Sequence, residues 1–587
     1  MIALALHRGR NMASRRAVSV VLLASLVLVA CAPAAPAVKG PNTESTVAQE
    51  ADSRSLVVFI RVEPSILATR GFVRKSAGLF FVWRIFNALP ALVDARGAPQ
   101  PELLTSLPSL NTDDWQVFPD GTMQTRYALR PNLTWHDGAP LTSEDFVFAW
   151  RVFSSPELGL SKQPPMSAIS EVETVDERHF VIRWKALYPD ADSLSTIDRE
   201  LPPLPQHILA AAFDQLASDG GDSLVNHPSW GPEYVGLGPY RLQGREPGSS
   251  MEAVRFDGYA LGAPKIPRIQ LRFSDDQNVV VAHMLSGDAQ VATDSSIGQA
   301  GGETLTREWA ANNGGTVFQL PSTWRYIGFQ LRPELASPRA VLDLRVRKAV
   351  AHAIDKQAVS DAAYSGQAIL ADTPIWSGSL WGAALDDTVP TYPFDPRAAE
   401  RLLNESGFSK GADGFYRGPD GQLSFELSST ESPTTAAEIQ VTASQLQAVG
   451  LETQQRVIPR LQAQDPQVRA SFPAMQLIST LMDEPGLDTL ASAQIPSDNN
   501  RWIGGNRGAW SSPAFDRLLE TFNTTLSRAD RVDLVRQMLK IYGQELPRIA
   551  MYFPATPFAY VAALRGPMVV APESRVAWNI HEWEFKL

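Results

Sequence analysis

The segment 127–154, YALRPNLTWHDGAPLTSEDFVFAWRVFS, constrains the fold more than any other part of this chain. Its first apolar side chains alternate along the chain, as they do on a strand with one buried face. They are Tyr127, Leu129 and Leu133. Asp137-Gly138 followed by Pro140 is typical of a turn, because these residues favour the tight backbone conformations that end a strand. We therefore predict a strand that ends in a turn of defined length.

A helix is predicted immediately after this turn. Thr142 with Asp145 three residues later matches a capping box, in which each residue's side chain bonds the other's backbone N–H. The apolar residues that follow have helical spacing and form one stripe: Phe146, Ala149, Trp150 and Phe153. The helix should pack against the preceding strand. Trp135, His136 and Asp137, taken alone, are explained by such packing, since a single exposed histidine is weak grounds for a functional site.

As a string, this segment resembles the signature of the family 5 extracellular solute-binding proteins, the oligopeptide- and dipeptide-binding components of ABC importers. LR-x-x-x-x-W-x-DG-x-P-x-x-A-x-D-V is typical of that family. The matching residues are Leu129-Arg130, Trp135, Asp137-Gly138, Pro140 and Asp145, whereas Ser143 and Phe146 depart from the pattern. The resemblance implies an α/β, periplasmic-binding-protein-like fold of two lobes, with an extra subdomain inserted in the first lobe. It implies ligand capture rather than catalysis.

Composition limits the partners of the folded body. A chain of 587 residues is too long for one hydrophobic core, and 44% apolar residues are enough for a well-packed protein of two to four structural units. The formal net charge is −11, and no basic run follows the first 20 residues. Nucleic acid and anionic membrane surfaces are therefore excluded as expected partners of the body.

The N-terminus is predicted to be a lipoprotein signal peptide, residues 1–31. Four arginines precede an apolar run from Ala17 to Ala30, which is short for a transmembrane span. The run ends in Leu28-Val29-Ala30-Cys31, which resembles a bacterial lipobox, and Cys31 is the only cysteine in the chain. We expect Cys31 to carry a lipid. Residues 32–54, rich in Ala, Pro, Ser and Thr without periodicity, are expected to form a flexible tether. Both Sec and twin-arginine export, and both Met1 and Met12 as the start, stay open.

Domain boundaries follow from composition and from further family-like strings. The first lobe is expected at residues 55–90 and 201–322, with the inserted subdomain at 91–200. The apolar run SLVVFIRV from Ser55 predicts a strand covered on both faces. GLGPYRL at 236–242 resembles a family turn, for which glycine is useful because it takes positive φ without steric cost.

The second lobe is predicted at residues 323–546, followed by a return to the first lobe at 547–587. LRVRKAVAHAID at 344–355 and the string 395–408 resemble two family helices, with Asp343 and Asp395 as N-caps. Strand-helix-strand alternation between 425 and 457 indicates an α/β lobe.

The sequence contains no Walker A string, no HExxH and no cysteine pair, so no metal or cofactor is expected. The GDSL tetrapeptide at 221–224 lies in a loop-like composition and is interpreted as chance. Trp324, Trp376, Trp381 and Trp502 are candidate ligand-binding residues, with ordinary packing as the alternative for each. The resemblance further implies that Asp483, or Glu484 beside it, pairs with the α-ammonium of a peptide ligand, with a solvated turn as the alternative.

These observations predict the substrate-binding lipoprotein of an ABC importer, not an enzyme. It would capture a small molecule or, by family frequency, a peptide, and deliver it to the permease subunits. We expect an exported monomer, anchored to the cell envelope by its N-terminal lipid. Two alternatives stay open: a lipid-anchored hydrolase, and a ligand-sensing lipoprotein without a transport partner.

Overall fold

The computed structural model describes residues 55–72, 79–158, 160, 165–195, 199–293, 295–321, 323–419, 421–432, 434–481, 485–500, 502, 504–571 and 574–586. All of them belong to one of the chain's two structural units, Asp52–Leu587. The predicted lipid-attachment residue Cys31, the tether 32–54 and the predicted ligand residues Asp483 and Glu484 lie outside the described residues. Within the described ranges, no helix combines the length and apolar character that a bilayer crossing requires.

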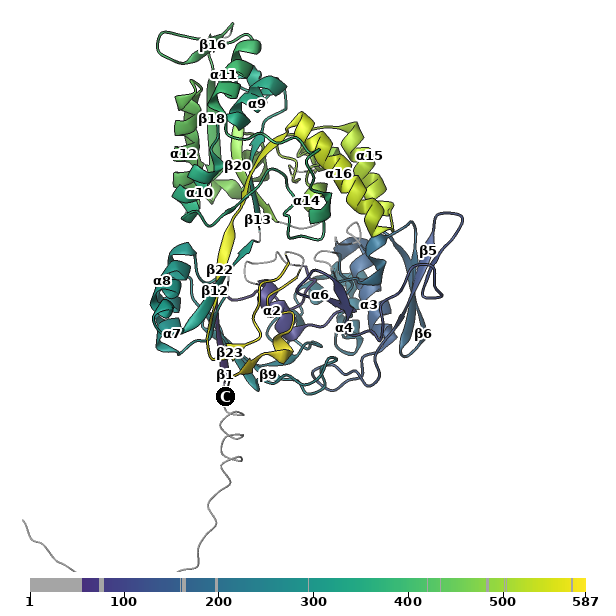
Figure 1. Cartoon of the computed structure of the whole chain (residues 1–587). Helices are drawn as coiled ribbons and strands as arrows, with labels where there is room; N and C mark the ends of the chain where they lie inside the picture. The colour runs from purple at the N-terminus through teal and green to yellow at the C-terminus, as the bar shows by residue number, and fades with distance from the viewer. Residues whose placement is uncertain are drawn as a thin grey trace, which may run out of the picture. The chain divides into compact units, whose positions relative to one another are not determined.

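The first lobe is built on a sheet of seven strands within the described residues (Figure 1). In spatial order they are β12 (Gly315–Pro321), β22 (Ala555–Val561), β11 (Val291–Ala292), β1 (Ser55–Ile60), β10 (Arg268–Phe273), β9 (Ser250–Arg255) and β8 (Tyr240–Glu246). β1 is central and runs parallel to both neighbours. Leu56, Val58 and Ile60 pack on the side of α2 (Leu79–Phe86), whereas Val57 and Phe59 pack with α7 (Gln277–Ser286) and α8 (Gln299–Ala310). The predicted strand with two covered faces is confirmed.

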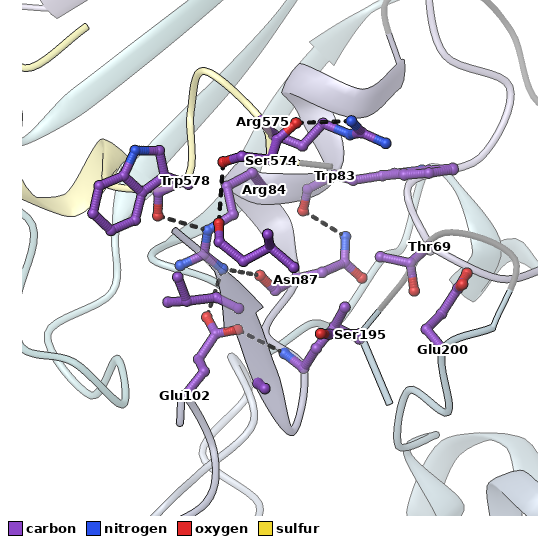
Figure 2. Close-up of a pocket in the computed structure, with 14 residues that line it drawn as sticks. Thr69, Trp83, Arg84, Asn87, Glu102, Ser195, Glu200, Ser574, Arg575 and Trp578 are labelled. Carbon is purple, nitrogen blue, oxygen red and sulfur yellow. Dashed lines mark hydrogen bonds and ion pairs between the residues drawn. The ribbon is translucent and has the colours of Figure 1, made fainter. Parts of the chain in front are cut away.

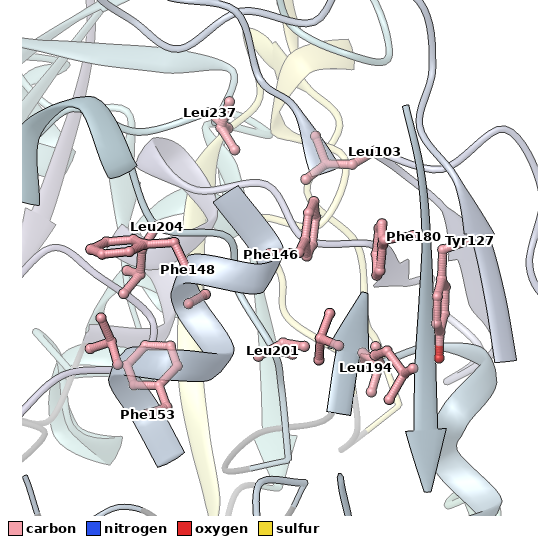
Figure 3. Packing of buried hydrophobic residues seen from close by; sticks show 14 of the residues in the cluster. Leu103, Tyr127, Phe146, Phe148, Phe153, Phe180, Leu194, Leu201, Leu204 and Leu237 are labelled. Carbon is pink, nitrogen blue, oxygen red and sulfur yellow. The ribbon is translucent and has the colours of Figure 1, made fainter. Parts of the chain in front are cut away.

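The inserted subdomain contains a four-stranded antiparallel sheet and the predicted helix α3 (Ser143–Ser154). Its described strands, in spatial order, are β4 (Trp115–Val117), β5 (Met123–Ala128), β7 (His179–Trp184) and β6 (Ile169–Asp176). Phe180 lies between Phe146 and Tyr127, with ring centroids 4.4 and 4.8 Å away (Figure 3). The helix thus packs on the strand before it, as predicted, and the Thr142–Asp145 capping box is present.

The chain does not return to the first sheet at Leu201, where a boundary was predicted. Leu201 and Leu204 are buried in the same cluster as Phe146 (Figure 3). The next helix, α4 (Gln206–Phe213), packs against α3, and the short helices α5 (Leu216–Asp219) and α6 (Asp222–Val225) continue from it. The first sheet resumes only at β8. A Leu- and Pro-rich string favours burial, but it does not specify which core receives it.

The second lobe is built on a sheet of six described strands. They are β14 (Ile369–Leu370), β21 (Arg548–Phe553), β13 (Thr323–Phe329), β20 (Met475–Leu481), β18 (Ser424–Thr430) and β19 (Glu452–Ile458). Its helices include α9 (Leu344–His352), α10 (Lys356–Tyr364), α11 (Pro396–Glu405), α12 (Thr435–Ala448), α14 (Pro485–Asp488), α15 (Pro513–Thr524) and α16 (Arg528–Glu545). Asp343 and Asp395 cap α9 and α11, as predicted.

The predicted return to the first lobe at residue 547 is wrong by one strand. β21 pairs with β13 and β14 in the second sheet, and only β22, from Ala555, joins the first. Both strands are apolar and buried, so their composition does not distinguish the two sheets. Shorter ladders are β2 (Ala91–Val93) with β3 (Pro99–Pro101), β15 (Ser409–Lys410) with β16 (Tyr416–Gly418) and β17 (Gly421–Gln422), and β23 (Leu564–Arg565) with β24 (Glu584–Phe585).

His136 is buried rather than exposed, and it joins the signature turn to the GLGPY turn. Its Nε2 donates to Gly238 O at 3.0 Å, because Nδ1 is the acceptor for Gly236 N–H at 3.2 Å. A Cβ on Gly236 or Gly238 would meet the backbone of Phe86 at 2.1 and 2.3 Å. Close backbone approach, rather than the positive φ expected from the sequence, is therefore what requires glycine there.

We predict that His136 makes the fold sensitive to acid. Burial lowers the pKa of His136 to about 4, so the unfolded chain binds a proton first as the pH falls below about 6.5. The free energy of unfolding should then fall by roughly 2–3 kcal/mol between pH 7 and 4.5 through this group alone. His136→Gln, which does not titrate, should lose that much less over the same range in urea unfolding. Equal acid losses in both proteins would contradict this assignment.

Candidate binding site

The carboxyl ends of the parallel strands of both sheets point toward the place where the chain crosses between the lobes. The chain crosses twice, first from β12 to β13 and then from β21 to β22. In the first lobe β1 runs parallel to β11, which is antiparallel to β22, and β22 begins just after the second crossing. In the second lobe β18 and β19 run parallel to β20, whose last residue, Leu481, pairs with Thr323 just after the first crossing. Ligands of open α/β sheets bind outside these ends. The crossing region is therefore where a binding site is expected.

On the second lobe, this edge carries a buried ion pair. Arg325 donates from Nε and Nη2 to both carboxylate oxygens of Glu438, at 2.9 and 2.5 Å. Tyr552 and Tyr364 donate to the same carboxylate, at 2.5 and 3.1 Å. Burial acts to lower the pKa of Arg325, but the Glu438 charge outweighs it and raises the pKa. The pair is fully hydrogen-bonded and holds the edge rigid.

On the first lobe, a cavity of about 90 Å³ opens beside α2 (Figure 2). Its walls come from α2, from strand β2 and Glu102 after β3, from subdomain residues that precede α4, and from the C-terminal segment. The polar lining residues are Thr69, Arg84, Asn87, Glu102, Ser195, Glu200, Ser574 and Arg575, and Trp83 and Trp578 supply indoles. A drug-sized ligand needs roughly 300–1,000 Å³. This cavity is therefore the size of a subsite for one group of a larger solute.

A buried network fixes one wall of the cavity. Arg84 and Glu102 form an ion pair at 2.5 Å, and Glu102 also accepts from Tyr259 at 2.7 Å and from Leu89 N–H at 2.9 Å. Arg84 Nε donates to Trp578 O at 3.0 Å, which ties the C-terminal segment to α2. Burial alone would lower the pKa of Arg84, but Glu102 and Tyr259 outweigh it and raise the pKa. This network positions the wall.

Three polar atoms in the cavity lining are free to meet a solute. Thr69 Oγ1, Ser195 Oγ and Trp578 Nε1 are buried and have no hydrogen-bond partner within the described part of the chain. Buried polar atoms usually have a partner, from protein, water or ligand. Two hydroxyls and an indole N–H can donate to or accept from a polar solute, while the Trp83 ring offers an apolar surface. The arrangement suits non-covalent binding.

The structure places the predicted tryptophans away from this cavity. Trp324 and Trp381 are buried in the second-lobe core, and Trp376 packs against the same cluster. Trp502 donates to Asp498 at 2.8 Å and lies under the guanidinium of Arg332. The positions of Trp324, Trp376 and Trp381 therefore favour ordinary packing over a role in ligand binding.

Sequence reasoning missed the cavity because its residues come from distant segments, from Thr69 to Trp578, and none stands in a recognisable motif. Two further interpretations of the sequence concern the GDSL tetrapeptide and metal binding. Ser223 of the GDSL tetrapeptide donates from its hydroxyl to the side chain of Gln215. Across the described residues, no group of three or more His, Cys, Asp or Glu side chains is placed to hold a metal ion.

We predict that Glu102→Gln destabilises the fold by roughly 3–5 kcal/mol, because it leaves the Arg84 charge buried without its carboxylate. Urea unfolding measures this loss. The control is Glu252→Gln, which breaks the Arg268–Glu252 pair at 2.6 Å, where both side chains are about half exposed; its cost should stay below about 1 kcal/mol. Similar costs for both variants would show that the Arg84–Glu102 pair has no structural role.

Comparison with known proteins agrees with this architecture. The model of the bacterial extracellular solute-binding proteins, family 5, matches residues 105–494. A Brucella ovis protein, named as a peptide-binding protein of an ABC transporter, is 26% identical over 50% of this chain and 51% of its own. The chain thus spans about half the length of this curated relative. The oligopeptide-binding protein AppA of Bacillus subtilis is 22% identical over 79% of this chain and 81% of its own.

Solved structures share the fold. NikA from Brucella suis, in complex with Fe(III)-EDTA, superposes with a TM-score of 0.73 at 16% identity, covering 91% of this chain and 100% of its own. The oligopeptide-binding protein of Thermus thermophilus, complexed with a pentapeptide, gives 0.70 at 20% identity, covering 90% and 96%. These likenesses confirm the predicted two-lobed, periplasmic-binding-protein-like α/β fold, and the family match extends over both lobes. The chain belongs to the bacterial extracellular solute-binding proteins of family 5.

Proposed function

We propose that this protein is the solute-binding component of an ABC importer, a non-catalytic protein that traps a solute between its lobes and delivers it to a membrane permease. The observation that carries the proposal is the first-lobe cavity, with its unpartnered Thr69, Ser195 and Trp578 atoms, in a chain of this family. A family member with a polar subsite on its first lobe has the geometry for capture.

A peptide is the proposed solute. Relatives are named for oligopeptides and dipeptides, and one solved neighbour holds a pentapeptide. The cavity is too small for a peptide and would take one side chain or terminus, with the rest lying between the lobes. In sequence, Asp483 and Glu484 follow β20, whose last residue, Leu481, pairs with Thr323 just after the crossing. We propose that one of them pairs with the peptide's ammonium group.

Capture would proceed by hinge closure. The lobes are joined by two strand crossings, β12 to β13 and β21 to β22, and a few residues at such connections absorb the rotation. Closure would remove water from the solute and strengthen its polar contacts with the cavity. The same hinge would reopen at the permease.

A peptide ligand should raise the melting temperature, because binding to the native state alone must stabilise it. Thermal-shift screening of a peptide and sugar library tests this, and a library without any stabilising compound would contradict the binding role.

For a peptide with a free amine, Asp483→Ala should weaken binding by roughly 2–5 kcal/mol, since a buried ammonium would lose its partner. Unchanged affinity in the variant, or for the N-acetylated peptide in wild type, would remove this anchor.

We further propose that the protein is exported and held at the cell envelope by a lipid on Cys31, with residues 32–54 as a tether. Support comes from the lipobox-like string before Cys31 and from the extracellular family. Cells fed a radiolabelled fatty acid should label the wild type, whereas Cys31→Ser should stay unlabelled and leave the membrane fraction. Absence of label in both proteins, with equal release, would overturn the lipid anchor.

A further inference from the structure

Four charged side chains join the inserted subdomain directly to the second lobe. Arg199, which lies between β7 and α4 in the subdomain, contacts Asp488 of α14 at 3.1 Å. Arg199 also contacts Asp190 of the subdomain at 3.1 Å, and Asp190 contacts Arg531 of α16 at 3.3 Å. These ion pairs form one row of alternating charges, Asp488–Arg199–Asp190–Arg531. The row runs from the second lobe to the subdomain and back to the second lobe.

The surroundings favour ion pairing at this place. The side chains of Arg199, Asp190 and Arg531 are 9, 12 and 7% exposed, so solvent screens them less than surface pairs, whereas Asp488 is 33% exposed. On the second-lobe side, Arg531 lies over the rings of Phe522 and Trp381, at 4.2 and 4.9 Å from their centroids. This aromatic platform fixes the guanidinium in position.

The network is also connected to the cavity. Glu200 follows Arg199 directly and lines the cavity, as does Ser195. The main-chain oxygen of Glu200 accepts a hydrogen bond of 3.0 Å from Arg70 of the first lobe. A short segment thus has one residue bound to the second lobe and its neighbour bound to the first-lobe side of the cavity.

We propose that Asp488, Arg199, Asp190 and Arg531 form a latch that holds the inserted subdomain closed against the second lobe. Ion pairs between domains can break and reform, as a closing and opening contact requires. The strand crossings permit the two lobes to rotate relative to each other. The latch lies at a separate place in the fold and stabilises the closed arrangement. Its effect on how long a solute is retained rests on the proposed function; the latch itself acts without a solute.

Amide hydrogen exchange of the full chain, without added solute, tests the latch. Asp488→Asn, in the second lobe, should speed exchange in the first lobe at the hydrogen-bonded amides of Ala191, Ser193 and Leu194. Asp190→Asn should reciprocally speed exchange at Leu490, Ala491 and Arg531 of the second lobe. On the order of tenfold is expected, which corresponds to about 1.4 kcal/mol.

The matched control is Asp386→Asn. Asp386 is also 33% exposed and pairs with one arginine, Arg536, at 2.8 Å, but both partners lie in the second lobe. It should leave the exchange of Ala191 unchanged, and the central strand β1 serves in every variant as the reference for global stability. Exchange that changes only in the mutated lobe, or equally in the control, overturns the latch. Such a result leaves solute binding, which is measured by thermal shift, unaffected.

Discussion

Two strand pairs that continue from one sheet into the other are the constraint on which the whole structure depends. β12 pairs with β22 in the first sheet and β13 pairs with β21 in the second, so both crossings lie side by side. Pro554 stands between β21 and β22 and has no N–H to give to either ladder. The ladders hold each lobe rigid up to the crossing, and rotation is confined to the few residues between them.

The Arg325–Glu438 pair indicates that the second lobe would move as one body in the proposed hinge closure. Both partners are buried, and the carboxylate accepts from Tyr364 of α10 and Tyr552 of β21 as well as from Arg325 of β13. Separating these elements would leave a buried charge unpaired, at roughly 3–5 kcal/mol. Bending within the lobe edge should therefore cost more than rotation at the crossing, so that the proposed solute would meet a preformed edge.

Local chemistry could be predicted from the sequence, whereas the choice of partner could not. The capping box at Thr142 and the N-caps Asp343 and Asp395 depend on residues within one turn of helix, and all three were correct. His136 was placed at the surface because its partners, Gly236 and Gly238, lie about 100 residues away in the chain. The Arg84–Glu102 pair in the cavity wall and the strand pairing of β21 could not be predicted for the same reason, since the partners are not recognisable from local sequence. The two-lobed fold was accessible only through the family-like strings, which carry the long-range pairing that local patterns lack.

Polar groups of the subdomain between β7 and α4 are satisfied in two different ways. At Arg199 the charge is satisfied by carboxylates from both lobes, and at Ser195 the hydroxyl is left without a described partner in the cavity. A solute that bonds Glu200 would restrict the residue next to Arg199, which must stay in place to reach Asp488. Binding and closure would then share one ordering cost, so that each lowers the cost of the other. A subdomain inserted between strands of one lobe can in this way report the occupancy of the site to the opposite lobe.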